Sequence, residues 1–399
     1  MIYDLPDTTT GAVNKKIIDI RESGGAVALG RVMTLIIVTE EGNAEEAIRA
    51  ANDASREHPC RVIAVVRGNR RGTNRLDAQI RVGGDAGASE VIVLRLYGAL
   101  AEHGDSVMVP FLLPDAPIVV WWPAECPVDP VHDAIGRMAQ RRITDAARAK
   151  NPIKALQQGA AHHAPGDTDL AWSRITLWRG LLAAALDEPP YEPVIAASVS
   201  GGSDSPSTDL LAAWLALYLK CPVTRERAAV GKGMLGVSLE RRGGTIDLQR
   251  PDGVVATLTQ PGQPERRIAL APRADRDCLA EELRRLDPDE VFAEVVTSGL
   301  TLLLANGAAK KAPAKKASTQ KAAVAKAPAQ KAPAQKGAAA KAPAQKAAAQ
   351  KAPAKKSAPA AKATAPAQAT APAKATAPVT AAARKAAAPR TATAKAPRS

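Results

Sequence analysis

The chain has 399 residues and a formal net charge of +14, but the charge is unevenly distributed. The last 92 residues hold 20 of the 54 Lys and Arg residues and no Asp or Glu, so the first 307 carry 34 basic and 40 acidic side chains. The first 307 residues therefore give no electrostatic signal of nucleic-acid binding. No apolar run approaches the length of a membrane span, and the N-terminus lacks a signal-peptide pattern, so we expect a cytoplasmic protein.

Residues 1–150 show the pattern of an α/β domain. A helix is expected around Val13, Ile17 and Ile20, which share one face. A second helix lies between the first two buried strands, and this order is typical of a largely parallel sheet. A third helix is predicted at 132–150. The predicted strands are 33–38, 61–66, 78–82, 90–96 and 118–122.

Residues 151–168 are predicted to be a linker, and residues 169–306 a second, α+β domain. A strand is expected at 193–199. From Met234, turn signals recur every eight to ten residues, which predicts an antiparallel meander. The helices of this domain are expected at 173–186, 207–220, 275–286 and 288–298, the last capped by Asp287 with Pro288 at its first position.

Residues 307–399 form a basic low-complexity tail. From Lys311 a lysine recurs every fifth residue as far as Lys356, in text such as KAPAQ. The tail contains eleven prolines, no aromatic residue and almost no apolar side chain larger than Ala, which predicts a disordered polycation. Such a segment can contact DNA or RNA non-specifically through counterion release, or act only as a solubilising spacer.

The segment SVSGGSDSPSTDLL, residues 198–211, follows a predicted strand and opens a predicted helix. Small residues at that position can expose backbone N–H groups to a phosphate. The segment lacks the glycine spacing of a dinucleotide fingerprint and the lysine of a P-loop. An ordinary strand-to-helix turn, capped by Ser205, explains it as well. The candidate phosphate-binding residues are Ser200, Gly201, Gly202 and Ser203.

Two tryptophan-bearing segments are candidate partner-binding surfaces. In VPFLLPDAPIVVWWP, residues 109–123, successive strand side chains face opposite ways, so one tryptophan can face outward. In DLAWSRITLWRGLL, residues 169–182, two tryptophans lie beside two arginines, a combination that often anchors partners. Packing in the core is the competing interpretation of both. The candidate residues are Trp121, Trp122, Pro123, Trp172, Arg174, Trp178 and Arg179.

No catalytic or metal-binding motif is recognised, and no cofactor is expected. His162 and His163 are adjacent, so on a regular element they point apart and are not expected to share a metal. The cysteines show no CxxC and no metal-type spacing, so free thiols are expected. The four cysteines are Cys60, Cys126, Cys221 and Cys278.

The two tryptophan segments, with RVMTLIIV at 31–38, resemble the glucose-6-phosphate dehydrogenase assembly protein family, OpcA. The resemblance covers nearly all of residues 1–305, and the basic tail lies outside it. It implies a non-catalytic protein that binds glucose-6-phosphate dehydrogenase, the first enzyme of the oxidative pentose phosphate pathway, and promotes its active oligomer. Glucose 6-phosphate and NADP then belong to the partner.

From the residues alone, two other functions stay open. Residues 198–207 can belong to an enzyme or sensor that binds a sugar phosphate or a nucleotide. The basic tail can make the chain a nucleoid-associated protein. Measured binding of phosphorylated metabolites tests the enzyme or sensor. Measured binding of DNA, with and without the tail, tests the nucleoid-associated protein.

Overall fold

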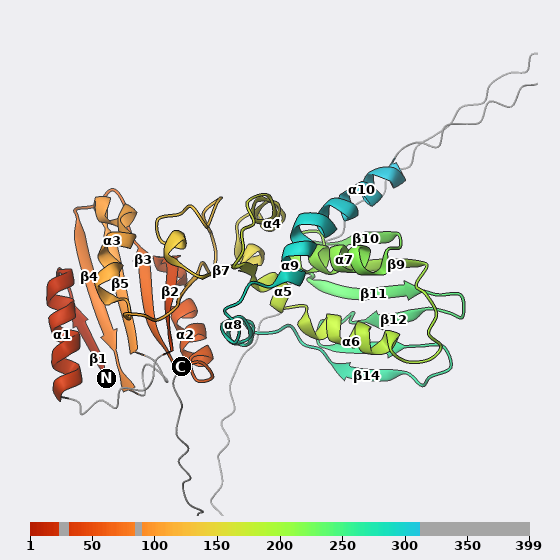
Figure 1. Ribbon diagram of the computed structural model, residues 1–399, viewed down its shortest axis with the longest axis horizontal. Helices are drawn as coiled ribbons and strands as arrows, with labels where there is room; N and C mark the ends of the chain where they lie inside the picture. Colours follow the sequence, from red (N-terminus) through yellow and green to blue (C-terminus); the bar gives the residue numbers. More distant parts are fainter. Residues whose placement is uncertain (24–31, 84–89, 312–399) are drawn as a thin grey trace, which may run out of the picture. The chain divides into compact units, whose positions relative to one another are not determined.

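Two β-sheets organise the part of the chain that the computed structural model describes (Figure 1). The described residues are 1–23, 32–83 and 90–311, with side chains as far as residue 305. By their internal contacts they belong to one unit, Met1–Ser318. No helix within these described ranges is long and apolar enough to cross a membrane.

The first sheet has eight strands. They are β1 (Ile2–Leu5), β2 (Met33–Glu40), β3 (Cys60–Arg67), β4 (Arg75–Arg81), β5 (Glu90–Tyr97), β6 (Ile118–Trp121), β7 (Arg141–Thr144) and β8 (Asp167–Asp169). Their order across the sheet is β1-β4-β5-β3-β2-β6-β7-β8. The strands from β5 to β8 in this order are parallel, and β4 and β1 add an antiparallel edge. The expectation of a largely parallel sheet is confirmed.

Both faces of this sheet are covered, which explains why its central strands are apolar almost throughout. Leu35 of β2 packs in one cluster with helix α2 (Ala44–Ala54), whereas the next residue, Ile36, packs in the cluster of helix α1 (Thr10–Ser23). The short helix α3 (Gly104–Met108) joins the α1 cluster. Helix α1 buries the three residues expected to share one face, Val13, Ile17 and Ile20.

The predicted helix at 132–150 is wrong. That stretch contains strand β7 and two short 3-10 turns. Arg141 donates to the carboxylate of Glu282 at 2.5 Å, and Arg142 donates to that of Asp167. The strand also pairs with β6 and β8, so partners distant in the sequence hold this stretch extended, and tertiary contacts override local helix propensity.

The stretch predicted as a linker, residues 151–168, contains regular structure. Helix α4 (Pro152–Ala161) begins with proline at its first position, and the Asn151 side chain accepts a hydrogen bond from the Lys154 N–H at 3.3 Å. The end of the stretch enters β8. The Asn–Pro pair is the signal of this helix start. A domain boundary in this stretch stays a prediction.

The second sheet has six strands in the order β10-β9-β11-β12-β13-β14. They are β9 (Ala196–Gly202), β10 (Val223–Ala228), β11 (Met234–Glu240), β12 (Ile246–Gln249), β13 (Val255–Thr259) and β14 (Arg266–Ala269). Strands β9 and β10 are parallel, and the rest pair antiparallel. Strands β11 to β14 are consecutive in sequence, so this part of the sheet is the expected meander.

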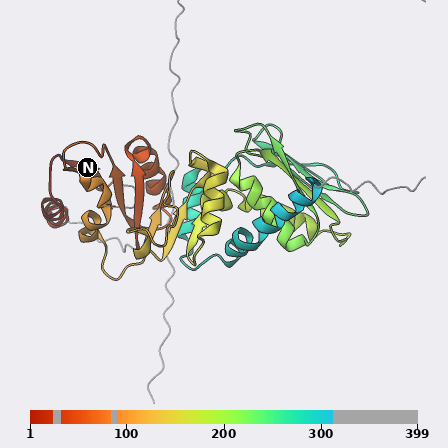
Figure 2. The ribbon, with the colours of Figure 1, turned by 90° about the horizontal axis from the view of Figure 1, so that it is seen from above.

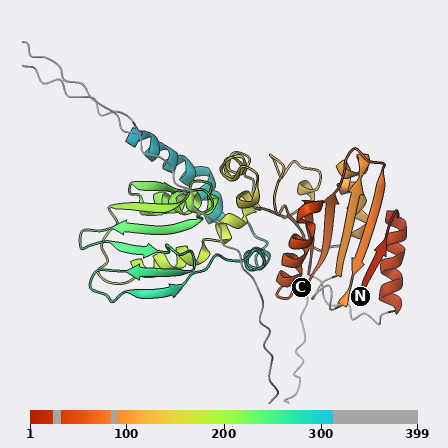
Figure 3. The same cartoon turned by 180° about the vertical axis from the view of Figure 1, so that it is seen from behind.

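Helices cover one face of the second sheet. In Figure 1, α6 (Thr176–Leu186) and α7 (Pro206–Leu219) lie in front of its strands, and from behind, in Figure 3, the strands lie in front. The expected helix at 173–186 is interrupted, because α5 (Leu170–Ser173) ends before α6 begins. Helix α8 (Asp275–Leu283) instead packs in the α2 cluster of the first sheet, through Cys278, Leu279 and Leu283.

The last described helices form one continuous run. Helix α9 (Glu290–Glu294) leads through a π-helical segment into α10 (Leu300–Lys311), which lies alongside α7 (Figure 2). The predicted cap at Asp287 is wrong, because the carboxylate of Asp289 accepts the hydrogen bond from the Phe292 N–H. Residues 307–311, at the start of the predicted tail, are helical. The rest of the predicted tail lies outside the described residues.

Candidate functional site

Trp121 and Trp122, at the end of β6, are both buried at 1% exposure. Trp121 packs in the α2 cluster and Trp122 in the α1 cluster, on opposite faces of the first sheet. Of the two interpretations of this pair, the structure shows packing of both rings in the core, because both faces of this sheet are covered. Pro123 is also buried and, with Trp121, lines a pocket of 190 Å³.

Trp172 and Trp178 are equally buried, at 1% and 2% exposure. The Trp172 indole N–H donates to the Asp289 carboxylate at 2.9 Å, and the Arg179 guanidinium lies 3.7 Å from the centre of the Trp172 ring. The aromatic and basic side chains of this segment thus stabilise the interior. Binding of a partner through them stays a prediction.

Arg174 stands at the centre of a buried ion-pair network. Its guanidinium donates to both carboxylate oxygens of Asp145, at 2.7 and 2.6 Å, and to Asp275 at 2.7 Å. Burial raises the pKa of Asp145 to about 6, an effect that the Arg174 contact opposes. Arg148 links Asp275 to Glu46 of α2. Arg174 is therefore already paired with two carboxylates.

The four candidate phosphate-binding residues do not present free N–H groups together. Ser200, Gly201 and Gly202 belong to strand β9. The Gly202 N–H donates to the Gly233 carbonyl at 2.7 Å, and the Ser203 N–H donates to the Ala228 carbonyl at 3.0 Å. The glycine at 201 is required by packing, since a Cβ there would lie 2.5 Å from the Gly233 oxygen. These contacts argue against a phosphate cradle at 200–203.

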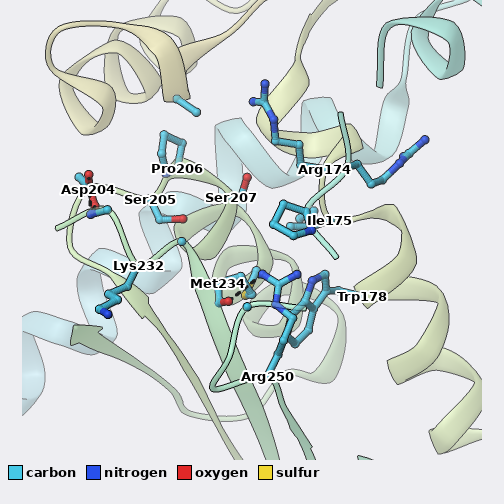
Figure 4. Close-up of a pocket in the computed structure, with 16 residues that line it drawn as sticks. Arg174, Ile175, Trp178, Asp204, Ser205, Pro206, Ser207, Lys232, Met234 and Arg250 are labelled. Carbon is cyan, nitrogen blue, oxygen red and sulfur yellow. Dashed lines mark hydrogen bonds between the residues drawn. The ribbon is translucent and has the colours of Figure 1, made fainter. Parts of the chain in front are cut away.

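The helix start that follows has the expected form. Ser205 caps α7 by accepting from the Thr208 N–H, and Pro206 occupies the first position. Beside this helix start lies a pocket of about 330 Å³, where the two candidate segments 169–182 and 198–211 meet (Figure 4). The volume lies at the lower end of the range typical of small-molecule sites.

The pocket combines an apolar wall with several cations. Arg250 and Lys232 are among its lining residues but are not among the candidates from the sequence, and the Gly-Lys-Gly sequence at 231–233 is the signal that could have indicated Lys232. No group of His, Cys, Asp or Glu among the described residues could hold a metal ion. The principal lining residues are Arg174, Ile175, Trp178, Asp204, Ser205, Pro206, Ser207, Lys232, Met234, Arg250 and Arg273.

The four cysteines are free thiols in the structure, as expected. Burial raises the pKa of both the Cys126 and the Cys278 thiols to about 12, and it also raises the pKa of Cys221. None of these three environments favours a thiolate. They thus lack the low thiol pKa typical of reactive cysteines.

The fold is that of a mixed α/β protein with two sheets, one largely parallel and one ending in an antiparallel meander. Two family models match it in succession: the glucose-6-phosphate dehydrogenase subunit N-terminal domain over residues 51–161 and the C-terminal domain of the same subunit over residues 165–296. Together they cover more than half of the chain. The chain belongs to the glucose-6-phosphate dehydrogenase assembly family, OpcA.

Similarity to solved structures is weak. An oxidoreductase from Sinorhizobium meliloti shares 10% identity at a TM-score of 0.40, with 70% of this chain and 98% of that chain covered. Biliverdin reductase from Synechocystis sp. PCC 6803, in complex with biliverdin and NADP+, shares 12% identity at a TM-score of 0.34, with 70% and 98% covered. No curated protein matches the chain. At these TM-scores the solved structures say nothing about activity or cofactor.

Proposed function

We propose that this protein binds glucose-6-phosphate dehydrogenase, promotes its active oligomer and is not itself a catalyst. The observation that supports the proposal is the succession of the two family models over residues 51–161 and 165–296. Both models are described as domains of a glucose-6-phosphate dehydrogenase subunit. A cytoplasmic location suits a partner of that metabolic enzyme.

The proposed activation has a thermodynamic requirement. A binding protein shifts an equilibrium between enzyme states only by as much as it binds one state better than the other. A stable complex also buries roughly 1,200–2,000 Å² of total surface. Because the four candidate tryptophans are buried, exposed side chains have to supply most of the surface of such an interface.

The test uses the full chain and the cognate dehydrogenase, each purified alone. We expect the mixture to elute earlier than either protein on a sizing column and to show higher dehydrogenase activity than the enzyme alone. The chain alone, with glucose 6-phosphate and NADP, should show no turnover. Co-elution without a change in activity contradicts the activation, and the absence of both effects contradicts the whole proposal.

A further inference from the structure

Arg250 is a buried cation without a carboxylate partner among the described residues. It is 5% exposed, and its two terminal nitrogens donate to the Leu270 carbonyl at 2.5 Å and the Met234 carbonyl at 2.8 Å. Its Nε has no partner in the described part of the chain. Burial of a charge is costly unless an opposite charge compensates it. Burial lowers the pKa of Arg250 and the charge of Asp252 opposes this effect, but the two form no ion pair, so the charge of Arg250 is only partly compensated.

Two other buried arginines, Arg61 and Arg141, differ from Arg250 because each has a carboxylate partner. Arg61 pairs with Glu90 at 2.9 Å, and Arg141 pairs with Glu282. Arg241, at 6% exposure, shares the deficit of Arg250, since it donates to the Pro190 carbonyl and its Nε is unpartnered within the described ranges. Of the two deficient arginines, Arg250 lines the 330 Å³ pocket and Arg241 does not.

The pocket around Arg250 has a flat apolar wall and a polar wall. The Arg250 guanidinium lies between Met234 and Trp178, 5.1 Å from the centre of the indole ring (Figure 4). The start of α7 is also part of the pocket lining, at Ser205 and Ser207. An aromatic face beside a guanidinium suits a ligand that joins a compact body to an anionic group.

The start of α7 adds donors. The helix has 14 residues, so the N–H groups of its first turn carry the positive end of its dipole. The Ser207 N–H donates to no acceptor among the described residues. The Ser205 oxygen accepts from both the N–H and the hydroxyl of Thr208, which leaves the Ser205 hydroxyl hydrogen for another acceptor.

The charged side chains that line the pocket carry a net positive charge. Asp204 is the one acid among its described lining residues, and it accepts a hydrogen bond from the Gly231 N–H. Arg174 and Arg273 are each paired with carboxylates. Lys232 is exposed and has no ion-pair partner within the described ranges, and Figure 4 shows its side chain directed away from Arg250. Arg250 and Lys232 together carry two positive charges, against the one negative charge of Asp204.

We infer that this pocket binds a small phosphorylated metabolite, with its phosphate between Arg250 and the start of α7 and its body against Trp178 and Met234. The volume of about 330 Å³ suits a single sugar phosphate or a mononucleotide better than a dinucleotide. The site is distinct from the backbone of residues 200–203. It does not depend on the proposed binding of the dehydrogenase.

The experiment measures binding by calorimetry to the full chain at constant ionic strength. The probes are inorganic phosphate and glucose 6-phosphate, with glucose as the uncharged control. Three proteins are compared: the natural chain, Arg250→Gln, and the matched control Arg241→Gln, which removes an equally buried arginine outside the pocket. The basic tail is the same in all three, so its phosphate binding cancels from the comparison.

We expect both phosphate probes to bind the natural chain and glucose not to bind. Arg250→Gln should weaken the phosphate probes at least about tenfold, and Arg241→Gln should leave their affinity unchanged. If Arg250→Gln does not fold, Lys232→Glu, an exposed change at the rim, should weaken them several-fold. Equal affinity in folded Arg250→Gln and the natural chain overturns the inference, as does equal weakening in the two arginine variants.

Discussion

Replacement of Trp172 by alanine tests whether this tryptophan belongs to the core or to an interface. The ring is 1% exposed, and truncation of a buried tryptophan to alanine costs about 3–5 kcal/mol of the free energy of unfolding. The change also removes the indole donor to Asp289 and the ring beneath Arg179. We therefore expect a loss near the upper end, about 4–5 kcal/mol, which is a large fraction of the roughly 5–15 kcal/mol of a typical domain.

The measurement is urea unfolding followed by far-ultraviolet circular dichroism, with Leu177→Ala as the control. Leu177 is 48% exposed in helix α6, so its truncation should change the free energy of unfolding by less than about 1 kcal/mol. Dehydrogenase binding is measured on the same samples. A Trp172→Ala protein that loses less than about 1 kcal/mol but no longer binds the enzyme would refute the core assignment and support an interface anchor.

Three further predictions follow from the buried charges, the thiols and the tail. Glu282→Gln leaves Arg141 buried without a charge partner and should lower the free energy of unfolding by about 3–5 kcal/mol, again measured in urea; a neutral effect contradicts the buried ion pair. Cys278, which is fully buried with a pKa raised to about 12, should be alkylated by iodoacetamide at pH 8 more slowly than the partly exposed Cys221, as read by mass spectrometry of peptides; the reverse order counts against the placement of α8. The full chain should bind DNA with an affinity that falls steeply with salt, and truncation after Asn306 should abolish this binding. Equal DNA binding by the truncated chain would contradict the conclusion that only the tail carries the positive charge that binds DNA.

The elements that the sequence predicted are those with a strong local signal. MTLIIV and RVIAVV are continuous apolar runs, and they form the parallel pair β2 and β3 because both faces of their sheet are covered. Strand β7, by contrast, has the sequence RRIT, which carries little local preference for a strand. Its extended form depends on pairing with β6 and β8 and on contacts with Glu282 and Asp167, which are all distant in the sequence.

The candidate site was located in part. The sequence marked both segments that meet at the pocket and the cap at Ser205, because helix starts follow short-range rules. Arg250 left no comparable signal. It becomes part of the site only because the end of strand β12 brings it against Trp178, which is distant in the sequence. The burial of four tryptophans likewise depends on which faces of the sheets are covered, a long-range property.

The pocket and the proposed partner can be connected energetically. Val230 and Val254 are 74% and 54% exposed, and each adjoins a pocket-lining glycine, Gly231 or Gly253. Both valines therefore lie at the rim of the pocket. Suppose that the dehydrogenase covers this rim and that a ligand in the pocket changes the affinity of this protein for the dehydrogenase by some factor. Binding of the dehydrogenase must then change the affinity of the pocket for the ligand by the same factor. A metabolite in the pocket would then regulate assembly, and the sign of the effect would follow from whether the partner closes the pocket or competes for its entrance.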